Sequence, residues 1–568
     1  MKIKLSLLFA CILCGICAAE EVIKFDDRLK DGDGIAAMAE IVKEISQKGG
    51  APVRVEFSPK LYVFPKNKEH SWFMNLSGLK NVTIDGRGAT IKFPAYNAFC
   101  KVNFSENITV KNFNFEHSTL PFTQGEILGK NEKESYFLLK LDDGYPELPS
   151  NEFVMKNYPG PQWMWGSFMD RKTRALKRGI MDHFFIGKVE ETETPRQYKI
   201  YAQKGYEWVL RDIRENTAFA MPVHQEPCKD WPNSNGVSTI GVTNSKDILF
   251  ENITMRAIRI LGMAGTGNVG KVTFKNCILT WRENSNDLIS SWRDGSHFKN
   301  NKIGPTLDGC MWEGLLDDCI NISTSPSFVK EELGGSKYRL HGGSYEKGAK
   351  LGVLYPDKGK WILDDDLYIT DCAPGGVVTL SKPLSDVVNF QEITQYEAVS
   401  GRGHKKARAT QLYNMGKVND GFAVRNCKFG IQRRFSMIIR APNGIIENNE
   451  IRGGTGVWLS NELGSWYEGP LPFNITMRNN KFAGTLGDRP LSIGVQTASP
   501  EIPLSAKLNI NIENNEFILT PENKQAIAIS SGQGIKINGN RFLDSNGKKI
   551  PSNEAVKVGN NAEVSISD

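Results

Sequence analysis

Apolar and polar residues recur along the chain in one short phrase: an apolar residue, a polar residue, an Asn and one further residue. The copies occupy residues 110–113, 250–253, 274–277, 424–427, 446–449, 477–480 and 512–515, and residues 537–540 close the series with Gly539 in the place of Asn. Within each run the copies lie about 22 to 35 residues apart, which is the range of solenoid repeats.

Each copy predicts a short strand followed by a tight corner. Side chains alternate along a strand, so one points into a coil and the next faces solvent. Asn and Gly tolerate the left-handed backbone that a corner requires. In coils stacked about 4.8 Å apart, the Asn amides can hydrogen-bond as a ladder. We therefore predict an all-β chain that forms a right-handed parallel β-helix. A β-sandwich with Asn-rich hairpins is the alternative, although two-residue hairpins prefer Asn-Gly.

Two regions lack the phrase and interrupt the predicted coil. Residues 120–235 are rich in aromatic residues and proline, and residues 327–415 contain apolar stretches separated by turn signals. We predict two inserted, barrel-like β-rich subdomains, because insertions into solenoids gather on one, often functional, side. The N-terminal cap and first coils then occupy residues 20–119, the central coils residues 236–326 and the C-terminal coils residues 416–568. Apolar residues at helical spacing predict a capping helix over residues 34–48.

The first 19 residues predict a signal peptide. Lys2 and Lys4 precede an apolar run over residues 5–17, and two alanines then meet the acidic residue Glu20. The apolar run is shorter than the about 20 residues that span a bilayer, and no later stretch qualifies. We expect export to the periplasm or the cell exterior and no membrane span. An uncleaved N-terminal anchor is the alternative.

Composition narrows the class of partner. The formal net charge of +6 at pH 7 is not gathered into a basic tail or stripe, which argues against nucleic acid. The 11 tryptophans and 54 glycines are typical of secreted carbohydrate-active proteins, in which flat rings stack on sugars. Three of the 10 cysteines lie in the predicted signal peptide. The others are odd in number and widely spaced, so we expect buried thiols rather than disulfides or a zinc site.

The densest group of reactive side chains lies in residues 292–298 and 312–322. Asp294 and the pair Asp317 and Asp318 are about 23 residues apart, close to one predicted coil, so their carboxylates should converge on one wall. A bulge after Gly314 would turn both paired side chains outward. Clustered acids retain a proton, which supplies the carboxylic acid and the carboxylate that glycosidic cleavage requires. A calcium site and plain turns are the alternatives.

Several residues around the three acids are candidates for substrate contact. Those beside the acids are Trp292, Arg293, His297, Trp312 and Glu313, and those in a later loop that could wall the pocket are Trp458, Asn461, Glu462 and Trp466. Each has a structural alternative, such as a ladder position for the histidine, a surface ion pair for the arginine and core packing for the tryptophans.

The segments at residues 294–298 (Asp-Gly-Ser-His-Phe) and 312–322 (Trp-Glu-Gly-Leu-Leu-Asp-Asp-Cys-Ile-Asn-Ile) resemble the core of glycoside hydrolase family 110. The resemblance implies a bacterial exo-acting α-galactosidase on a parallel β-helix with inserted β-barrels. It implies Asp294 as the general acid, Asp317 with Asp318 as the base, and inversion of configuration. Leu316 and Cys319 depart from residues that members often carry, which leaves the linkage open, with α-1,3 expected.

The expected substrate is an oligosaccharide or polysaccharide that ends in α-linked galactose. We expect no cofactor and no bound metal ion, and the sequence leaves a homodimer open. Another β-helix hydrolase, or a lyase of a uronic-acid or galactan polymer, is the alternative enzyme, although the acid-dominated cluster favours hydrolysis. A non-catalytic glycan-binding solenoid is a third possibility. Stacked coils about 4.8 Å apart do not choose between inversion and retention.

Overall fold

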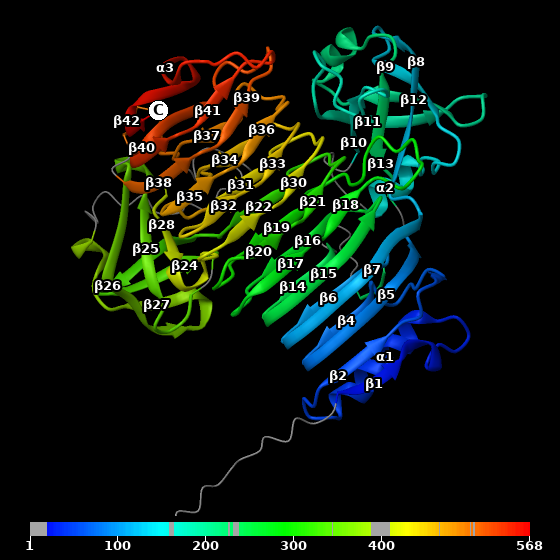
Figure 1. Cartoon of the computed structure of the whole chain (residues 1–568), viewed down its shortest axis with the longest axis horizontal. Coiled ribbons are helices and arrows are strands. Elements are labelled where there is room, and N and C mark those ends of the chain that lie inside the picture. The colour runs from blue at the N-terminus through cyan, green and yellow to red at the C-terminus, as the bar shows by residue number, and fades with distance from the viewer. Residues whose placement is uncertain are drawn as a thin grey trace, which may run out of the picture.

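The computed structural model describes residues 20–157, 164–224, 228–230, 238–343, 345–387, 409–464, 466–499, 501–503 and 506–567. The predicted signal peptide lies outside these residues. Within them, parallel strands stack into one long coil with two barrels beside it (Figure 1). This arrangement confirms the predicted parallel β-helix with two inserted β-rich subdomains. No helix of the described part is long and apolar enough to cross a membrane.

The coil has three faces, each a stack of parallel strands in register. The first face contains β4 (Trp72–Ser77), β6 (Ala98–Asn103), β14 (Ser238–Thr243), β16 (Leu261–Thr266), β19 (Ser296–Lys299), β22 (Ile320–Ser323), β31 (Met437–Ile439), β34 (Val457–Leu459), β37 (Leu491–Ile493), β40 (Ile527–Asn538) and β42 (Val556–Ser567). The second contains β1 (Glu21–Lys24), β2 (Val53–Glu56), β5 (Lys80–Pro94), β7 (Glu106–Thr119), β15 (Lys246–Arg256), β17 (Val272–Lys275), β20 (Thr306–Asp308), β29 (Ala423–Arg425), β32 (Ile445–Glu447), β35 (Ile475–Arg478) and β38 (Lys507–Glu513). The third contains β3 (Leu61–Val63), β18 (Ile278–Thr280), β21 (Met311–Trp312), β30 (Lys428–Phe429), β33 (Glu450–Ile451), β36 (Lys481–Ala483), β39 (Glu516–Ile518) and β41 (Arg541–Leu543).

Asparagines build the corners, as the repeated phrase predicts. In the C-terminal coils Asn448, Asn479 and Asn514 have φ of 57°, 55° and 54°, in the left-handed region. The ladder there is formed by the next asparagine of each copy. Asn480 Nδ2 donates to Asn515 Oδ1 over 2.9 Å, and the ladder runs in the same way from Asn449 to Asn540. One asparagine therefore turns the corner and its neighbour bonds the coils together.

The α1 helix (Gly34–Ser46) covers the N-terminal end of the coil (Figure 1). The side chain of Asp33 accepts the backbone N–H groups of Ile35 and Ala36 and so caps the helix. The apolar side of the helix joins the coil core, where Met38 and Ile41 are buried. The predicted capping helix is thereby confirmed. Two shorter helices are α2 (Asn151–Asn157) and α3 (Ser552–Ala555).

Two closed six-stranded barrels interrupt the coil. The first contains β8 (Phe122–Asn131), β9 (Tyr136–Leu141), β10 (Trp165–Met169), β11 (Phe184–Glu191), β12 (Gln197–Ala202) and β13 (Ala218–Pro222). The second contains β23 (Ser327–Gly334), β24 (Lys337–His341), β25 (Lys350–Tyr355), β26 (Lys360–Ala373), β27 (Val377–Leu380) and β28 (Gln411–Asn414).

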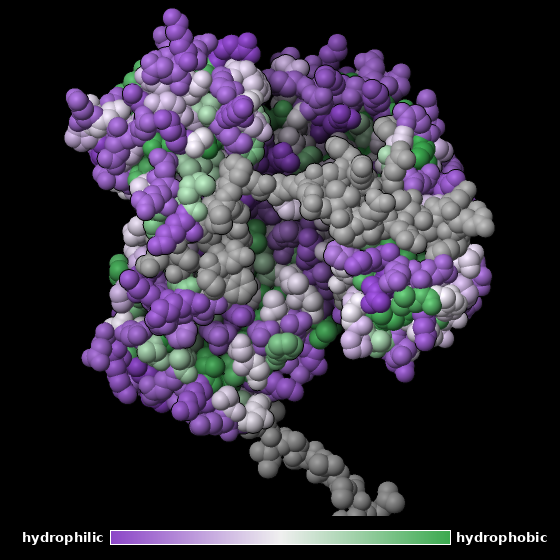
Figure 2. Space-filling view, turned by 180° about the vertical axis from the view of Figure 1, so that it is seen from behind, coloured by the Kyte–Doolittle hydropathy of each residue, from purple (hydrophilic) through white to green (hydrophobic). Residues whose placement is uncertain are grey.

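The barrels flank the first face of the coil. Trp165 of the first barrel packs in one apolar cluster with Trp292 and Leu316, which lie just ahead of β19 and β22. The second barrel follows the end of β22, and its Phe328 contacts Tyr467 edge to face. Seen from behind, the molecule has a recess between the barrels with hydrophilic side chains at its floor (Figure 2). The two barrels therefore form the sides of this recess.

The cysteines follow their predicted role with one exception. All seven in the described residues are free thiols, and all are buried except Cys372. The prediction of burial is wrong for Cys372, because it lies near the end of β26, where that strand runs along the outer surface of the barrel.

Candidate active site

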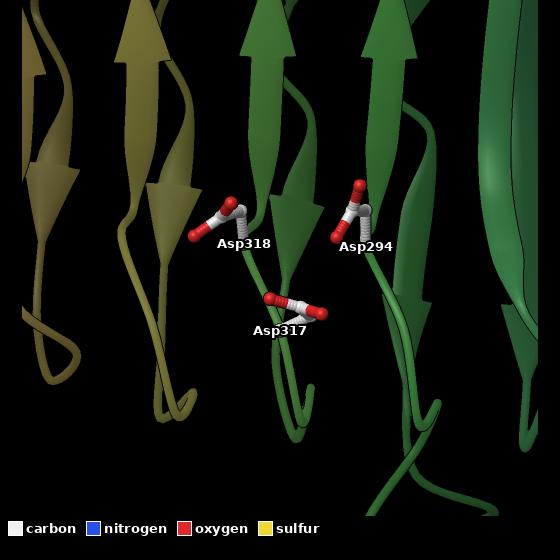
Figure 3. A group of neighbouring side chains, drawn as sticks. All are labelled: Asp294, Asp317 and Asp318. Atoms are coloured by element: carbon white, nitrogen blue, oxygen red, sulfur yellow. The ribbon is translucent and has the colours of Figure 1, made fainter. Parts of the chain in front are cut away.

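The three predicted acids meet on one wall of the coil (Figure 3). Asp294, Asp317 and Asp318 each present a carboxylate oxygen, and these oxygens lie within 4.8 Å of one another. Asp294 lies two residues before β19 and Asp318 two residues before β22, and these strands pair in register. Backbone hydrogen bonding joins the two segments, since Gly295 N–H donates to the Asp318 carbonyl over 2.8 Å. The stacking of coils therefore brings together acids that are distant along the chain.

Two glycines shape the segments that carry the acids. A Cβ at Gly295 would lie 2.3 Å from the Trp312 ring, so only glycine permits this close approach. Gly314 has φ of 78° and begins the corner ahead of β22. The predicted bulge is wrong: Asp317 and Asp318 lie in the connecting segment before the strand, where alternation along a pleat does not apply.

The three carboxyl groups lie in different electrostatic environments. Burial raises the pKa of Asp294 well above its usual value, and the charges of Asp317 and Asp318 raise it further. Burial and then Asp317 raise the pKa of Asp318 to about 7, although the Phe435 N–H donates to Asp318 over 3.0 Å and opposes the shift. Asp317 instead lies 3.7 Å from the guanidinium group of Arg293. The wall thus combines groups that retain a proton with a charge-balanced carboxylate.

Arg433 connects the acids to the first barrel. Its side chain is almost fully buried, and its Nε donates to the Leu316 carbonyl over 2.6 Å. One terminal nitrogen lies 2.9 Å from Asp182, which precedes β11, and the other lies 3.7 Å from Asp317. The sequence offers no motif for this residue, which lies in a corner segment after β30.

Glu468 is a further site residue that the sequence analysis missed. It is 4% exposed, accepts from Lys299 Nζ over 3.0 Å and pairs with Arg440. Burial alone would raise the pKa of Glu468, but the nearby imidazole of His297 and the charges of Lys299 and Arg440 hold it well below its usual range. Asn321 on β22 also donates to this carboxylate over 3.2 Å. Glu468 lies in a loop without the repeated phrase, so no sequence signal marks it.

His297 links this carboxylate to the acids. Its Nδ1 lies 3.5 Å from Asp294 Oδ2, and its Nε2 lies 3.7 Å from Glu468 Oε1. His297 sits on β19 and is half-buried, beside the predicted acid Asp294. The imidazole can therefore orient the Asp294 carboxyl group while Glu468 orients the imidazole.

The predicted tryptophan contacts are wrong for Trp292 and Trp312. Trp312 is fully buried in the coil core, stacked on Phe429 at 5.1 Å between ring centroids, and its Nε1 donates to Ser296 Oγ over 3.0 Å. Trp292 is 2% exposed and packs edge to face on Trp165 of the first barrel. Burial keeps both rings from a ligand, so core packing accounts for them.

The remaining predicted residues have mixed placements. Glu313 follows β21 on the third face, where Thr280 donates to it over 3.4 Å, and burial raises its pKa. Glu462 accepts the backbone N–H groups of Gly464, Trp466 and Tyr467, and its backbone pairs with that of Glu468. It therefore shapes the loop that carries Glu468. Trp466 is 63% exposed on this loop.

Three close carboxylates are also a possible site for a divalent cation. The surroundings of these acids fit a cation poorly. Calcium requires six to eight oxygen ligands and ionised carboxylates. Here three carboxylates converge, and Arg293 and Arg433 place positive charge beside Asp317. The arrangement suits proton transfer better than metal binding.

Comparison with known proteins identifies distant relatives. No family model matches the chain. It is 22% identical over 559 residues to alpha-1,3-galactosidase B of Bacteroides thetaiotaomicron, covering 91% of this chain and 86% of the relative. It is 23% identical to alpha-1,3-galactosidase A of the same organism, covering 92% and 91%. A solved family 28 exopolygalacturonase of Yersinia enterocolitica aligns with a TM-score of 0.40 and 11% identity, covering 96% of this chain and 78% of that chain. The resemblance in the acidic motifs thus extends, as distant homology, over most of the chain.

Proposed function

We propose that this distant homologue of the alpha-1,3-galactosidases is an exo-acting glycoside hydrolase that removes terminal α-linked galactose, with α-1,3 linkage expected. The observation that carries the proposal is the convergence of Asp294, Asp317 and Asp318 within 4.8 Å on one wall of the coil, with Asp294 and Asp317 half-buried and Asp318 buried. The relatives' names supply the sugar and the linkage. An oligosaccharide or polysaccharide ending in galactose is the proposed substrate.

In the proposed reaction Asp294 is the general acid. Its raised pKa keeps a proton available for the glycosidic oxygen as the bond between that oxygen and the anomeric carbon breaks. Asp317, balanced by Arg293, takes a proton from water with Asp318 beside it, and the water oxygen bonds to the anomeric carbon. Products are galactose and the shortened glycan, and Asp294 ends ionised until it regains a proton.

Inversion of configuration rests on the family resemblance. Inverting pairs usually stand about 6.5–9.5 Å apart and retaining pairs about 5–5.5 Å. The closest oxygens of the three acids lie within 4.8 Å, nearer the retaining range. The separation of the acids therefore does not establish the stereochemical course. The anomeric configuration of the released galactose establishes it.

The deciding experiment incubates the purified protein with α-galactosyl oligosaccharides of different linkage and follows the products by proton NMR. We expect β-galactose to appear first and to mutarotate later. First appearance of α-galactose would exclude inversion, and products that absorb in the ultraviolet would indicate a lyase. Release of no galactose from any linkage would remove the proposed activity.

Substitution of the acids tests their roles. We expect Asp294→Asn and Asp317→Asn each to lower kcat by about 10²-fold or more, the usual order for loss of an acid or base. Asp365→Asn is the matched control, because Asp365 is an exposed carboxylate of the second barrel paired with Lys350. Circular dichroism should show the fold intact in all three. Full activity of Asp294→Asn would exclude its role as the acid.

We also propose that the chain is exported and cleaved before Glu20. The basis is the cationic and apolar pattern of the first 19 residues. Mass spectrometry of the mature protein from its host should give an N-terminus at Glu20 in the periplasmic or external fraction. Recovery of the uncleaved chain in the membrane fraction would instead support an N-terminal anchor.

A further inference from the structure

A groove of about 680 Å³ runs along the first face on the C-terminal side of the three acids. Its near end is lined by Phe435 and Trp458, and its far end by Ser530 and Lys557. The near end touches the site directly, because the backbone N–H of Phe435 donates to Asp318 over 3.0 Å. The groove therefore begins next to the proposed catalytic wall.

The floor of the groove is the later part of a row of outward-facing positions in register on successive strands, and Trp458, Ser492, Ala528 and Lys557 of this row line it. The row passes from His297 through Asn321, Ile438, Trp458, Ser492 and Ala528 to Lys557. After Trp458 the side chains become small, and this change opens the groove. From Trp458 on β34 to Lys557 on β42 the groove crosses three strand spacings, or about 14 Å. That length exceeds one sugar ring and suits a chain of several.

The lining has the chemistry of a sugar-binding surface. Phe435 and Trp458 are both half-buried, and their rings stack at 5.2 Å with an interplanar angle of 24°. Arg440 lies 5.4 Å from the centroid of the Trp458 ring and is itself held by Glu468, so the ring is fixed in place. A fixed aromatic surface buries the C–H face of a sugar. Ser492 and Ser530 provide hydroxyl groups for hydrogen bonds further along.

We propose that this groove binds the part of the glycan on the leaving-group side of the scissile bond, and that the substrate is a chain of several sugars rather than a short galactoside. The inference rests on the proposed function, because it assigns the terminal galactose to the three acids. An exo-acting enzyme needs a short site for the terminal unit and an open path for the remainder, and the groove provides that path.

The experiment compares substrates that share one α-1,3-galactosyl end and carry one to four further sugars. For the wild type, we expect kcat/KM to rise by about 10-fold or more with chain length. Trp458→Ala should abolish most of that rise, while Trp458→Phe should retain it. Ser492→Trp, which fills the groove beyond Trp458, should also abolish it. Trp208→Ala is the control, because Trp208 is 45% exposed on the segment between β12 and β13.

Three outcomes overturn the inference or separate it from the proposed function. Equal kcat/KM for all chain lengths in the wild type would exclude the groove, as would an equal loss on all substrates in Trp458→Ala. If no substrate releases galactose, the proposed function has failed. Calorimetric titration with the galactose-free tetrasaccharide then decides the groove alone: binding that is lost in Trp458→Ala and Ser492→Trp supports it, and absence of binding to the wild type overturns it.

Discussion

Glu468 sits almost fully buried against His297, Lys299 and Arg440. Glu468→Gln removes its charge and leaves two cations without their partner. We expect the free energy of unfolding, measured by urea denaturation at pH 7, to fall by about 3 kcal/mol or more. Glu516→Gln is the control, since Glu516 pairs with Lys481 on the surface and should change stability by less than about 1 kcal/mol.

The pH dependence of this loss has a definite sign. The pKa of Glu468 is lowered from its usual 4.5 in the folded protein. Its contribution to stability is therefore complete above that value and is lost as the pH falls toward the folded pKa. The gap between the wild type and Glu468→Gln should narrow below about pH 4.5. A gap that widened in acid would contradict the ionised state of Glu468.

Asp318 presents the opposite case, because its pKa is raised from 3.8 to about 7. Ionisation costs free energy in the folded state, and the cost grows as the pH rises between these two values. Asp318→Asn removes the charge but keeps an oxygen for the Phe435 N–H. We expect the variant to be more stable than the wild type at pH 8 by at least about 1 kcal/mol, with the difference vanishing toward pH 4. Equal stability at pH 8 in thermal or urea unfolding would show that Asp318 ionises freely.

Single residues also show what the sequence could predict. The three acids could be found because they recur one coil apart. The burial of Trp312 could have been predicted in the same way. Trp312 aligns with Leu279 and Phe429, which fill the core in neighbouring coils. Glu468 could not be found, because the loop that carries it follows no period, and only folding brings it to His297.

At the scale of elements, the buried asparagine ladder holds the C-terminal coils together. Asn480 donates to the Ile446 carbonyl and to Asn515, and it accepts from the backbone and side-chain N–H groups of Asn449. Asn480→Ala leaves several buried groups unpaired, so we expect a loss of about 3 kcal/mol in the free energy of unfolding. Urea denaturation measures it.

The neighbouring asparagine is the control for this loss. Asn479 turns the corner with φ of 55°, which glycine adopts readily. Asn479→Gly should therefore change stability by less than about 1 kcal/mol. Equal losses in the two variants would mean that the corner and not the ladder carries the stability.

The strands and the corners followed from the repeated phrase, because period-two alternation and left-handed asparagines are local properties of the chain. The path of the segment before β22 could not be predicted from the repeated phrase. Gly314 indicated a distortion, but whether a glycine bends a strand or ends it depends on the neighbouring coils.

At the scale of the molecule, Arg433 joins the first barrel to the coil and to Asp317. Arg433→Met keeps much of the side-chain volume but removes the charge and the donors. We expect kcat/KM on an α-galactoside to fall by about 10-fold or more. Asp317 loses a nearby positive charge, and the first barrel loses its salt bridge to the coil beside the acids. Arg178→Met is the control, since Arg178 ties the same barrel to Glu522 through an exposed pair. Similar losses in both variants would assign the effect to barrel docking alone.

The presence of two inserted subdomains could be predicted from the regions in which the repeated phrase is absent. The positions of the two subdomains on the coil could not be predicted in this way. The packing of Trp165 against Trp292 and the contact of Phe328 with Tyr467 join residues far apart in sequence, with no shared pattern. These contacts set the walls of the recess, so the depth of the site is a property of the assembled molecule.

The outward row on the first face has an evolutionary consequence. Each of its positions belongs to a different rung, and the inward neighbours on that rung hold the core: Trp458 lies between the buried residues Val457 and Leu459, and Ser492 between Leu491 and Ile493. Exchange of one outward side chain therefore alters a single step along the row and spares the packing beneath it. The outward row can therefore diversify by independent substitutions, while the three acids next to its first position remain unchanged.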